Sequence, residues 1–168
     1  MKKLGIMTAL LVVLAAPLVA RAERIKASLI GYQEVPAVST VASGAFSATI
    51  SPDDESIDYE LTYSELQGMV TQSHIHVAQL SVNGSIVIWL CGTAMNPGPA
   101  GTQTCPPSGT ITGTITAANV VATPSQQLAA EDLAAVIAAI RAGVAYANVH
   151  TDLSPGGEIR GQIQASSR

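Results

Sequence analysis

The sequence predicts an all-β protein, an antiparallel β-sandwich or barrel-like domain with one or two short helices. Two observations lead to this prediction. Segments rich in β-branched and aromatic residues recur at short intervals along the chain, and turn residues such as Gly, Pro, Asn and Asp separate them. Many short strands with turn signals between them are typical of sandwiches and barrels.

An apolar leader precedes the expected strands. The segment MKKLGIMTALLVVLAAPLVARA has two lysines, an apolar run over residues 4–19 and the small-x-small sequence ARA at its end. This is the pattern of a secretory signal peptide. A membrane anchor, the alternative, needs about 20 apolar residues, and this run is shorter and contains a proline. We expect a cleaved signal peptide over residues 1–22, one domain over residues 23–168, and a secreted or periplasmic location.

The charge of residues 23–168 narrows the choice of partners. Five basic residues stand against twelve acidic ones, a formal charge of −7, and Lys26 is the only lysine. Binding to phosphate groups needs clustered Lys and Arg, so nucleic acid is not expected as a partner. No later segment is apolar over the length that a membrane span requires. We therefore expect no membrane span after signal cleavage.

Eight segments are expected to form strands. The clearest is IDYELTY, in which Ile57, Tyr59 and Leu61 alternate with polar residues, as in a half-buried strand. SIVIWLC is a continuous apolar run that suits a sandwich core, and GTITGTIT alternates in the same way as a strand. The expected strands are, in order, Arg24 to Ile30, Ala42 to Ile50, Ser56 to Tyr63, Gln72 to Leu80, Ser85 to Cys91, residues 109–116, Val144 to His150, and Glu158 to Ala165.

One segment, AAEDLAAVIAAIRAG, has a helical pattern. Glu131 and Asp132 are expected in its first turn, where they complement the helix dipole, and Arg141 in its last turn. Gly143 is placed to end the helix. An apolar stripe that would pack on the sheet is formed by Leu133, Val136, Ile137 and Ile140.

The two cysteines flank a loop rich in Gly, Pro and Thr, CGTAMNPGPAGTQTC. In an oxidising compartment, a pair of cysteines such as Cys91 and Cys105 is expected to form a disulfide. Binding of a metal by the two thiolates would need a closer spacing, as in CxxC. We therefore predict a structural disulfide, worth about 3 kcal/mol for a loop of this size.

The chain has three histidines, and two of them lie in the sequence SHIHV. Residues two apart on a strand point to the same side, so His74 and His76 share a face. His150 ends a later expected strand. Three imidazoles with an open position are a recurrent arrangement for Zn²⁺, and imidazole also suits copper. The histidines therefore predict a metal site, provided that His150 converges on the other two.

Neighbouring polar residues allow other interpretations. The histidines can instead form an outward polar row with Asn148, Glu158 and Arg160, tied by hydrogen bonds and an ion pair across neighbouring strands. These residues would otherwise surround the metal as a second shell. Glu34, in the sequence QEVP, is a further possible ligand, because a carboxylate oxygen is an acceptable partner for Zn²⁺ bound by histidine. The same polar face could also contact a protein partner.

Several enzyme classes have no support in the sequence. There is no G-x-S-x-G nucleophile motif and no paired-carboxylate motif, and the cysteines are expected to be bonded. Phosphate-binding loops of the GxxxxGK[ST] or GxGxxG type do not occur. We predict no catalytic residues for hydrolysis.

Three segments together resemble a known family. They are LIGYQEVPAVSTVASGAFSATI, SHIHVAQLSVNGSIV and AYANVHTDLSPGGEIRGQI, and they are similar to the CHRD domain, first described in chordin and found in many bacterial secreted proteins. The resemblance covers residues 27–164. It implies an extracytoplasmic β domain. Chordin is an extracellular antagonist that binds growth factors of the bone-morphogenetic type, whereas most bacterial members have no assigned activity.

The leading hypothesis is an exported, non-catalytic binding module that takes up one copper or zinc ion through His74, His76 and His150. The alternative is a structural or adhesive protein of the cell envelope or extracellular space, which contacts a protein partner. A third hypothesis is a small copper enzyme with redox chemistry. Because protonated imidazole cannot ligate, metal affinity is expected to fall at acidic pH.

Overall fold

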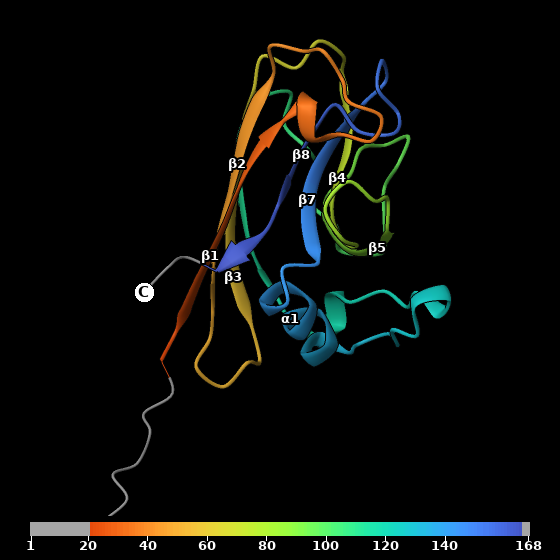
Figure 1. Ribbon diagram of the computed structural model, residues 1–168. Coiled ribbons are helices and arrows are strands. Elements are labelled where there is room, and N and C mark those ends of the chain that lie inside the picture. The colour runs from red at the N-terminus through yellow and green to blue at the C-terminus, as the bar shows by residue number, and fades with distance from the viewer. Residues whose placement is uncertain (1–20, 166–168) are drawn as a thin grey trace, which may run out of the picture.

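The computed structural model describes residues 21–165 (Figure 1). The expected signal peptide lies outside the described residues, except for its last two positions. The strands are β1 (Glu23–Ile30), β2 (Ser43–Ile50), β3 (Ile57–Ser64), β4 (Val70–Val77), β5 (Ser85–Cys91), β6 (Gly109–Ile115), β7 (Ala145–Thr151), β8 (Ile159–Gln162) and β9 (Gln164–Ala165). The helix α1 spans Leu133–Arg141, and short 3₁₀ turns are formed by Gly31–Gln33, Ala117–Asn119 and Pro124–Gln126. Over residues 21–165, no helix reaches the length and hydropathy of a membrane span.

All named strands belong to one antiparallel sheet, as the sequence predicted. Its order is β5-β4-β7-β8-β1-β2-β3-β6, and β9 adds a short pairing to β1. The sheet curls into a barrel-like shape whose two outermost strands, β5 and β6, come from the middle of the chain (Figure 1). Across the seam between them, the Tyr59 hydroxyl donates to the Leu90 carbonyl at 3.1 Å. The barrel is therefore nearly closed.

Alternation along β1, β2 and β3 places the core. In β3 the residues Ile57, Tyr59, Leu61 and Tyr63 are buried, whereas Asp58 and Glu60 between them are exposed. Leu61 lies opposite Phe46 of β2, and both are within the core. Full burial of a side chain of this size stabilises the fold by about 1.5–3 kcal/mol. The hydrophobic pattern therefore fixes the register, because a slip by one residue would turn these side chains to solvent.

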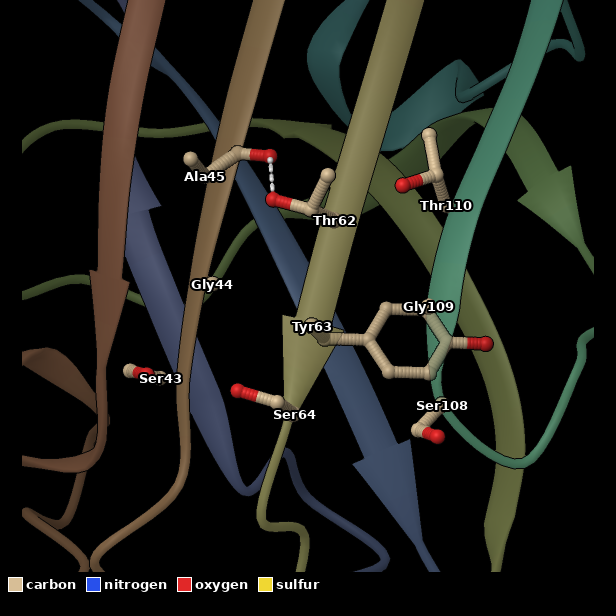
Figure 2. A pocket seen from close by; sticks show the side chains of 9 residues that line it. All are labelled: Ser43, Gly44, Ala45, Thr62, Tyr63, Ser64, Ser108, Gly109 and Thr110. Atoms are coloured by element: carbon tan, nitrogen blue, oxygen red, sulfur yellow. Dashed lines mark hydrogen bonds between the residues drawn. The ribbon is translucent and has the colours of Figure 1, made fainter.

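The outer face of β2, β3 and β6 carries a shallow hollow of about 540 Å³ (Figure 2). Hydroxyl groups of Ser43, Thr62, Ser64 and Thr110 line it beside glycine backbone, and no charged side chain does. The Thr62 hydroxyl donates to the Ala45 carbonyl at 3.4 Å. This surface holds no acid, base or metal ligand, so the candidate chemistry lies elsewhere in the fold.

The helix is shorter than the sequence predicted. It begins at Leu133, and Asp132 is its N-cap, whose carboxylate accepts from the Ala135 N–H at 3.0 Å. Glu131 lies before the helix at φ 63°, so its expected place in the first turn is corrected. Gly143 follows the helix at φ 71°, a conformation that glycine adopts without strain. The apolar stripe is buried as predicted.

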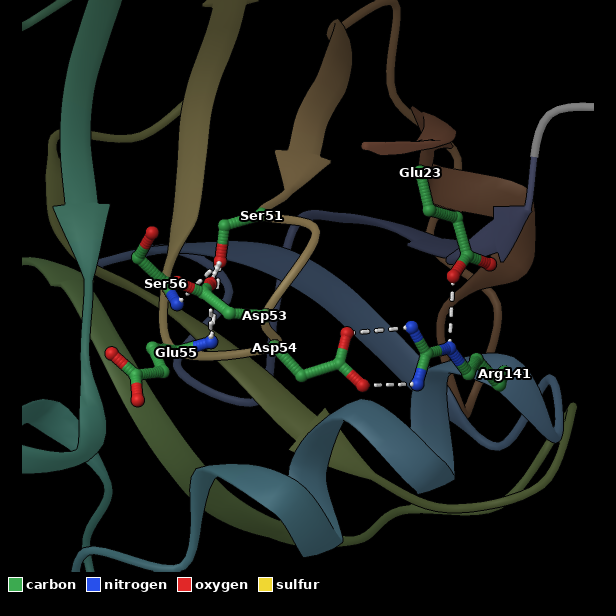
Figure 3. A network of polar contacts seen from close by, with 7 residues as sticks. All are labelled: Glu23, Ser51, Asp53, Asp54, Glu55, Ser56 and Arg141. Carbon is green, nitrogen blue, oxygen red and sulfur yellow. Dashed lines mark hydrogen bonds and ion pairs between the residues drawn. The ribbon is translucent and has the colours of Figure 1, made fainter. Parts of the chain in front are cut away.

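The end of α1 is tied to two other segments by Arg141 (Figure 3). Its guanidinium donates twice to Asp54, at 2.7 and 2.8 Å, and once to Glu23 at 2.8 Å. All three side chains are partly exposed. Exposed ion pairs contribute about 0–1 kcal/mol, so this network orients the helix end more than it stabilises the fold.

The final expected strand is divided in two. Residues 159–162 pair with β7, whereas Gln164 and Ala165 pair with β1. Between them, the Ile163 N–H donates to the Ala145 carbonyl at 2.8 Å. The change of partner interrupts the ladder. The bounds of a second strand also differ from the prediction. It was predicted over Gln72 to Leu80 and runs from Val70 to Val77.

The predicted disulfide between Cys91 and Cys105 is present. It joins the end of β5 to the segment before β6 and so closes the loop at the seam. A Cys91→Ala/Cys105→Ala variant is expected to lose about 3 kcal/mol of unfolding free energy, because the unfolded chain gains freedom. Urea unfolding of oxidised native protein and of the variant measures the difference. A change below about 0.5 kcal/mol would contradict this expectation.

Candidate metal centre

The pairing of β4 with β7 brings the histidines together. His74 lies opposite Asn148, His76 opposite Tyr146, and Gln72 opposite His150. Because alternate residues share a face, the histidines of β4 and the polar residues of β7 form one cluster. The sequence could place His74 and His76 together, and the strand register adds His150.

The three imidazoles converge within a short distance. One ring nitrogen from each of His74, His76 and His150 lies within 4.8 Å of the others. The Nδ1 atom of His74 is 3.3 Å from Nε2 of His150. The side chains are buried, with exposed fractions of 0%, 6% and 6%. Such a group could hold one metal ion without further movement of the strands.

Backbone carbonyls fix the orientation of two of the rings. The His76 Nδ1–H donates to the Gly84 carbonyl at 3.0 Å, and the His150 Nδ1–H donates to the Pro155 carbonyl at 2.9 Å. Because these Nδ1 atoms carry the proton, each Nε2 atom keeps its lone pair free for a ligand. A second-shell hydrogen bond of this kind accompanies nearly all histidine metal ligands.

The side chain of Asn148 faces the same two lone pairs. Its Oδ1 atom is 3.1 Å from Nε2 of His76 and 3.0 Å from Nε2 of His150. The Glu34 carboxylate lies near the Asn148 side chain, and its buried Oε1 atom has no hydrogen-bond partner among the described residues. The two nitrogen lone pairs and the Asn148 amide group therefore meet at one point. A bound cation would accept both lone pairs, and the amide turned by 180° would donate to them.

Aromatic contacts hold the remaining surfaces of the rings. Trp89 of β5 packs almost perpendicular to His74, with the ring centroids 4.3 Å apart. Tyr146 stacks on His76 at 4.7 Å and nearly parallel. Within the described chain, Nε2 of His74 is buried and has no hydrogen-bond partner. The rings are thus held in position by packing as well as by hydrogen bonds.

Burial keeps the histidines neutral. Desolvation lowers the pKa of His74 to about 2, helped by the nearby His150 and His76. Desolvation also lowers the pKa of His76, to about 4, and lowers the pKa of His150. Neutral imidazole is the form that binds a metal. The three imidazoles are therefore in the neutral, metal-binding form across the physiological pH range.

Arg160 lies beside the cluster but does not form the predicted ion pair. Its guanidinium sits 3.7 Å from the ring centre of Tyr146 and donates to the Val82 carbonyl and to Asn83 Oδ1, both at 3.0 Å. The cross-strand ion-pair network expected for Glu158 and Arg160 is not found among the described residues. The salt bridges found among residues 21–165 are those of Arg141. Arg160 instead fixes the turn before β5, which contains Gly84.

Glu158 occupies a different place from the one expected. Its carboxylate accepts from Thr40 Oγ1, the Gln67 N–H and Thr151 Oγ1 at 2.8 Å, and from the Gly68 N–H at 3.3 Å. These bonds go to loops at one end of the barrel and none joins an imidazole. The strand begins one residue later, at Ile159, so strand alternation does not direct this side chain.

Glu34 approaches the cluster from the loop after β1. Its side chain is buried beside Asn148, and the carboxylate packs against Gly157, where an added Cβ would lie 2.4 Å from Oε1. Burial raises the pKa of Glu34 to about 7, although Arg160 partly opposes the shift. The carboxylate reaches the cluster through Asn148. Direct ligation by Glu34 stays a prediction.

Two residues of the cluster were not singled out from the sequence as site residues. Trp89 lies in an apolar run that indicates a core strand, and Tyr146 shares a face with Asn148 and His150. Their contacts with His74 and His76 depend on which strands are neighbours. Because Tyr146 alternates onto the same face as Asn148 and His150, its position beside the histidines could have been predicted from the sequence.

The fold and the site define a barrel-like antiparallel β domain with a buried three-histidine cluster under its loops. The family model of the CHRD domain matches residues 25–163, and the chain belongs to this family. The resemblance seen in the sequence is thereby confirmed. No curated protein and no solved structure matches the chain.

Proposed function

We propose that this CHRD domain is a non-catalytic binding module that takes up one transition-metal ion, copper or zinc, through His74, His76 and His150. The observation that supports this most is the convergence of buried acceptors. The Nε2 lone pairs of His76 and His150 meet at Asn148 Oδ1, with Nδ1 of His74 close by. Nitrogen ligands of this kind suit both ions.

We further propose that the module works outside the cytoplasm. The support is the disulfide between Cys91 and Cys105, because such bonds persist in oxidising compartments and are rare in the cytosol. The leader-like sequence of residues 1–22 agrees with export. A binding module in this place would take up free metal ions that enter the periplasm or the extracellular space.

The first test is a titration of metal-stripped protein with Cu²⁺ and Zn²⁺, followed by calorimetry and by fluorescence. We expect binding of one ion per chain. The chain has a single tryptophan, and Trp89 touches His74, so bound paramagnetic Cu²⁺ should quench its emission, whereas Zn²⁺ should not. This pairing of metals reports where the ion sits as well as that it binds.

Variants separate the site from incidental binding. The His74→Ala/His76→Ala/His150→Ala protein should bind more than about 100-fold more weakly, since even outer-shell changes cost 10- to 100-fold. Gln79→Ala is the matched control, because Gln79 follows β4 and its side chain is exposed to solvent. It should bind like the native protein. If the folded native protein binds neither Cu²⁺ nor Zn²⁺, the proposal is wrong.

A further inference from the structure

Three loops at one end of the barrel expose large apolar side chains. The loops are residues 31–42, 65–69 and 152–158, and they meet at the end of the molecule opposite α1 (Figure 1). Their exposed apolar residues, called here the loop-end surface, are Tyr32, Val41, Met69 and Leu153, with exposed fractions of 69%, 70%, 74% and 70%. Single exposed apolar residues are common on proteins, but a group of them marks an interaction site.

Hydrogen bonds hold this surface in a fixed arrangement. The buried carboxylate of Glu158 accepts from Thr40, which precedes Val41, and from the Gly68 N–H, which precedes Met69. Met69 and Asp152 are joined twice, by Met69 N–H to Asp152 Oδ1 at 2.7 Å and by Asp152 N–H to the Met69 carbonyl at 3.0 Å. Leu153 follows directly. Val41, Met69 and Leu153 therefore each lie next to a residue that these hydrogen bonds hold in place.

A surface that is ordered before binding loses little conformational entropy when a partner arrives. Exposed methionine and leucine side chains often lie at the tips of mobile loops. Here the hydrogen bonds described above fix the backbone of the loops, so mobility does not explain the exposure. Burial of these side chains against a partner would remove apolar area from water. The arrangement thus has the properties of an apolar contact centre.

The charges around the loop-end surface select the kind of partner. None of the three loops contains Lys or Arg, and the exposed acids on them are Glu65 and Asp152. Anionic lipid surfaces and nucleic acids attract basic proteins, so both fit poorly. A protein surface with an apolar centre and a rim of Lys or Arg would complement it.

We propose that the loop-end surface docks a protein partner whose contact surface is apolar at its centre and basic at its rim. This inference is independent of the metal proposal, because it uses none of the imidazoles. Two of the three loops also border the histidine cluster, through the Pro155 carbonyl and Glu34, on the side away from the exposed apolar residues.

The test uses a random 12-residue peptide library displayed on phage, selected on the full chain. A Met69→Ser/Leu153→Ser variant removes two centres of the surface. Leu80→Ser/Met95→Ser is its matched control, since Leu80 and Met95 are 64% and 88% exposed and lie on other loops. Thermal unfolding must show that both variants fold. Synthetic copies of enriched peptides are then titrated against all three proteins.

We expect enriched peptides that combine apolar residues with Lys or Arg. They should bind the Met69→Ser/Leu153→Ser variant at least about tenfold more weakly than the native protein, and the control variant unchanged. Their affinity should fall with added salt. The proposal is overturned if no peptide is enriched, if enriched peptides lack basic residues, if both variants bind alike, or if the native protein instead binds phosphatidylcholine or phosphatidylglycerol vesicles through Met69 and Leu153.

Discussion

Metal-free protein should lose stability steeply as the pH is lowered from about 6.5 to about 4.5. In this range the unfolded chain protonates its histidines, whose ordinary pKa is 6.5. The folded chain does not, since burial lowers the pKa of His74 to about 2 and that of His76 to about 4, and lowers the pKa of His150. The unfolded state therefore holds more protons, and acid favours it.

Glu34 opposes this effect in part. Its pKa is raised from 4.5 to about 7 in the folded protein, so the folded state holds one proton that the unfolded state releases above pH 4.5. The stability that this proton gives is present at low pH and is lost as the pH rises through about 7. His74 and His76, set against Glu34, leave an excess of about one proton on the unfolded chain, and His150 adds to it. The expected loss is about 3 kcal/mol or more over two pH units.

Urea unfolding at half-unit steps of pH, with a chelator present, measures this loss. A His74→Phe/His76→Phe/His150→Phe variant, if it folds, is the control, because it keeps ring volume but cannot titrate. Its pH profile should flatten or reverse, since Glu34 remains. A native profile that is level between pH 6.5 and pH 4.5 would show that the imidazoles are protonated in the folded protein.

Replacement of Glu158 is expected to give the second large effect. Glu158→Ala should lower the unfolding free energy by about 3–5 kcal/mol, because it leaves two backbone N–H groups and two hydroxyl groups without their acceptor. Gln67, Gly68 and Thr40 would then no longer be held to the strand that begins at Ile159. Local hydrogen exchange should rise most in residues 64–69.

Two further variants distinguish charge from shape. Glu158→Gln keeps one acceptor oxygen and should lose less than Glu158→Ala, and Glu60→Gln, on the exposed face of β3, should change stability by less than about 0.5 kcal/mol. Burial opposes ionisation of Glu158, but its hydrogen bonds outweigh this and lower the pKa below 4.5. The contribution of the charge is thus present above pH 4.5 and lost in stronger acid. Equal stability of Glu158→Ala, Glu158→Gln and Glu60→Gln at pH 7 would contradict the expected role of the Glu158 hydrogen bonds.

The sequence predicted the strands well where one face alone is buried. Ile57, Tyr59 and Leu61 alternate with exposed acids, so period and burial agree. Alternation predicts the environment of a residue less well where both faces of a strand are covered. In β7 every residue is buried, because loops cover the side that carries Asn148 and His150. The polar residues of β7 therefore indicate a buried candidate site and not contact with solvent.

The candidate site was predictable only as far as local geometry reaches. Strand period places His74 and His76 on one face, but the approach of His150 depends on the β4–β7 register, which joins residues 76 positions apart. Glu158 was misplaced because its strand begins at the next residue. Long-range pairing and element boundaries are the two properties that alternation cannot supply.

The position of β1 in the sheet bears on the order in which the chain can fold as it is synthesised. β1 lies inside the sheet, paired on one side with β2 and on the other with β8 and β9, which end at residue 165. Three of its paired positions face β8 and β9, which are more than 100 residues further along the chain. The hairpin of β1 and β2 can form early, but the barrel cannot close until β8 and β9 have been synthesised. A chain stalled near residue 155 would present an open β1 edge to any neighbouring strand.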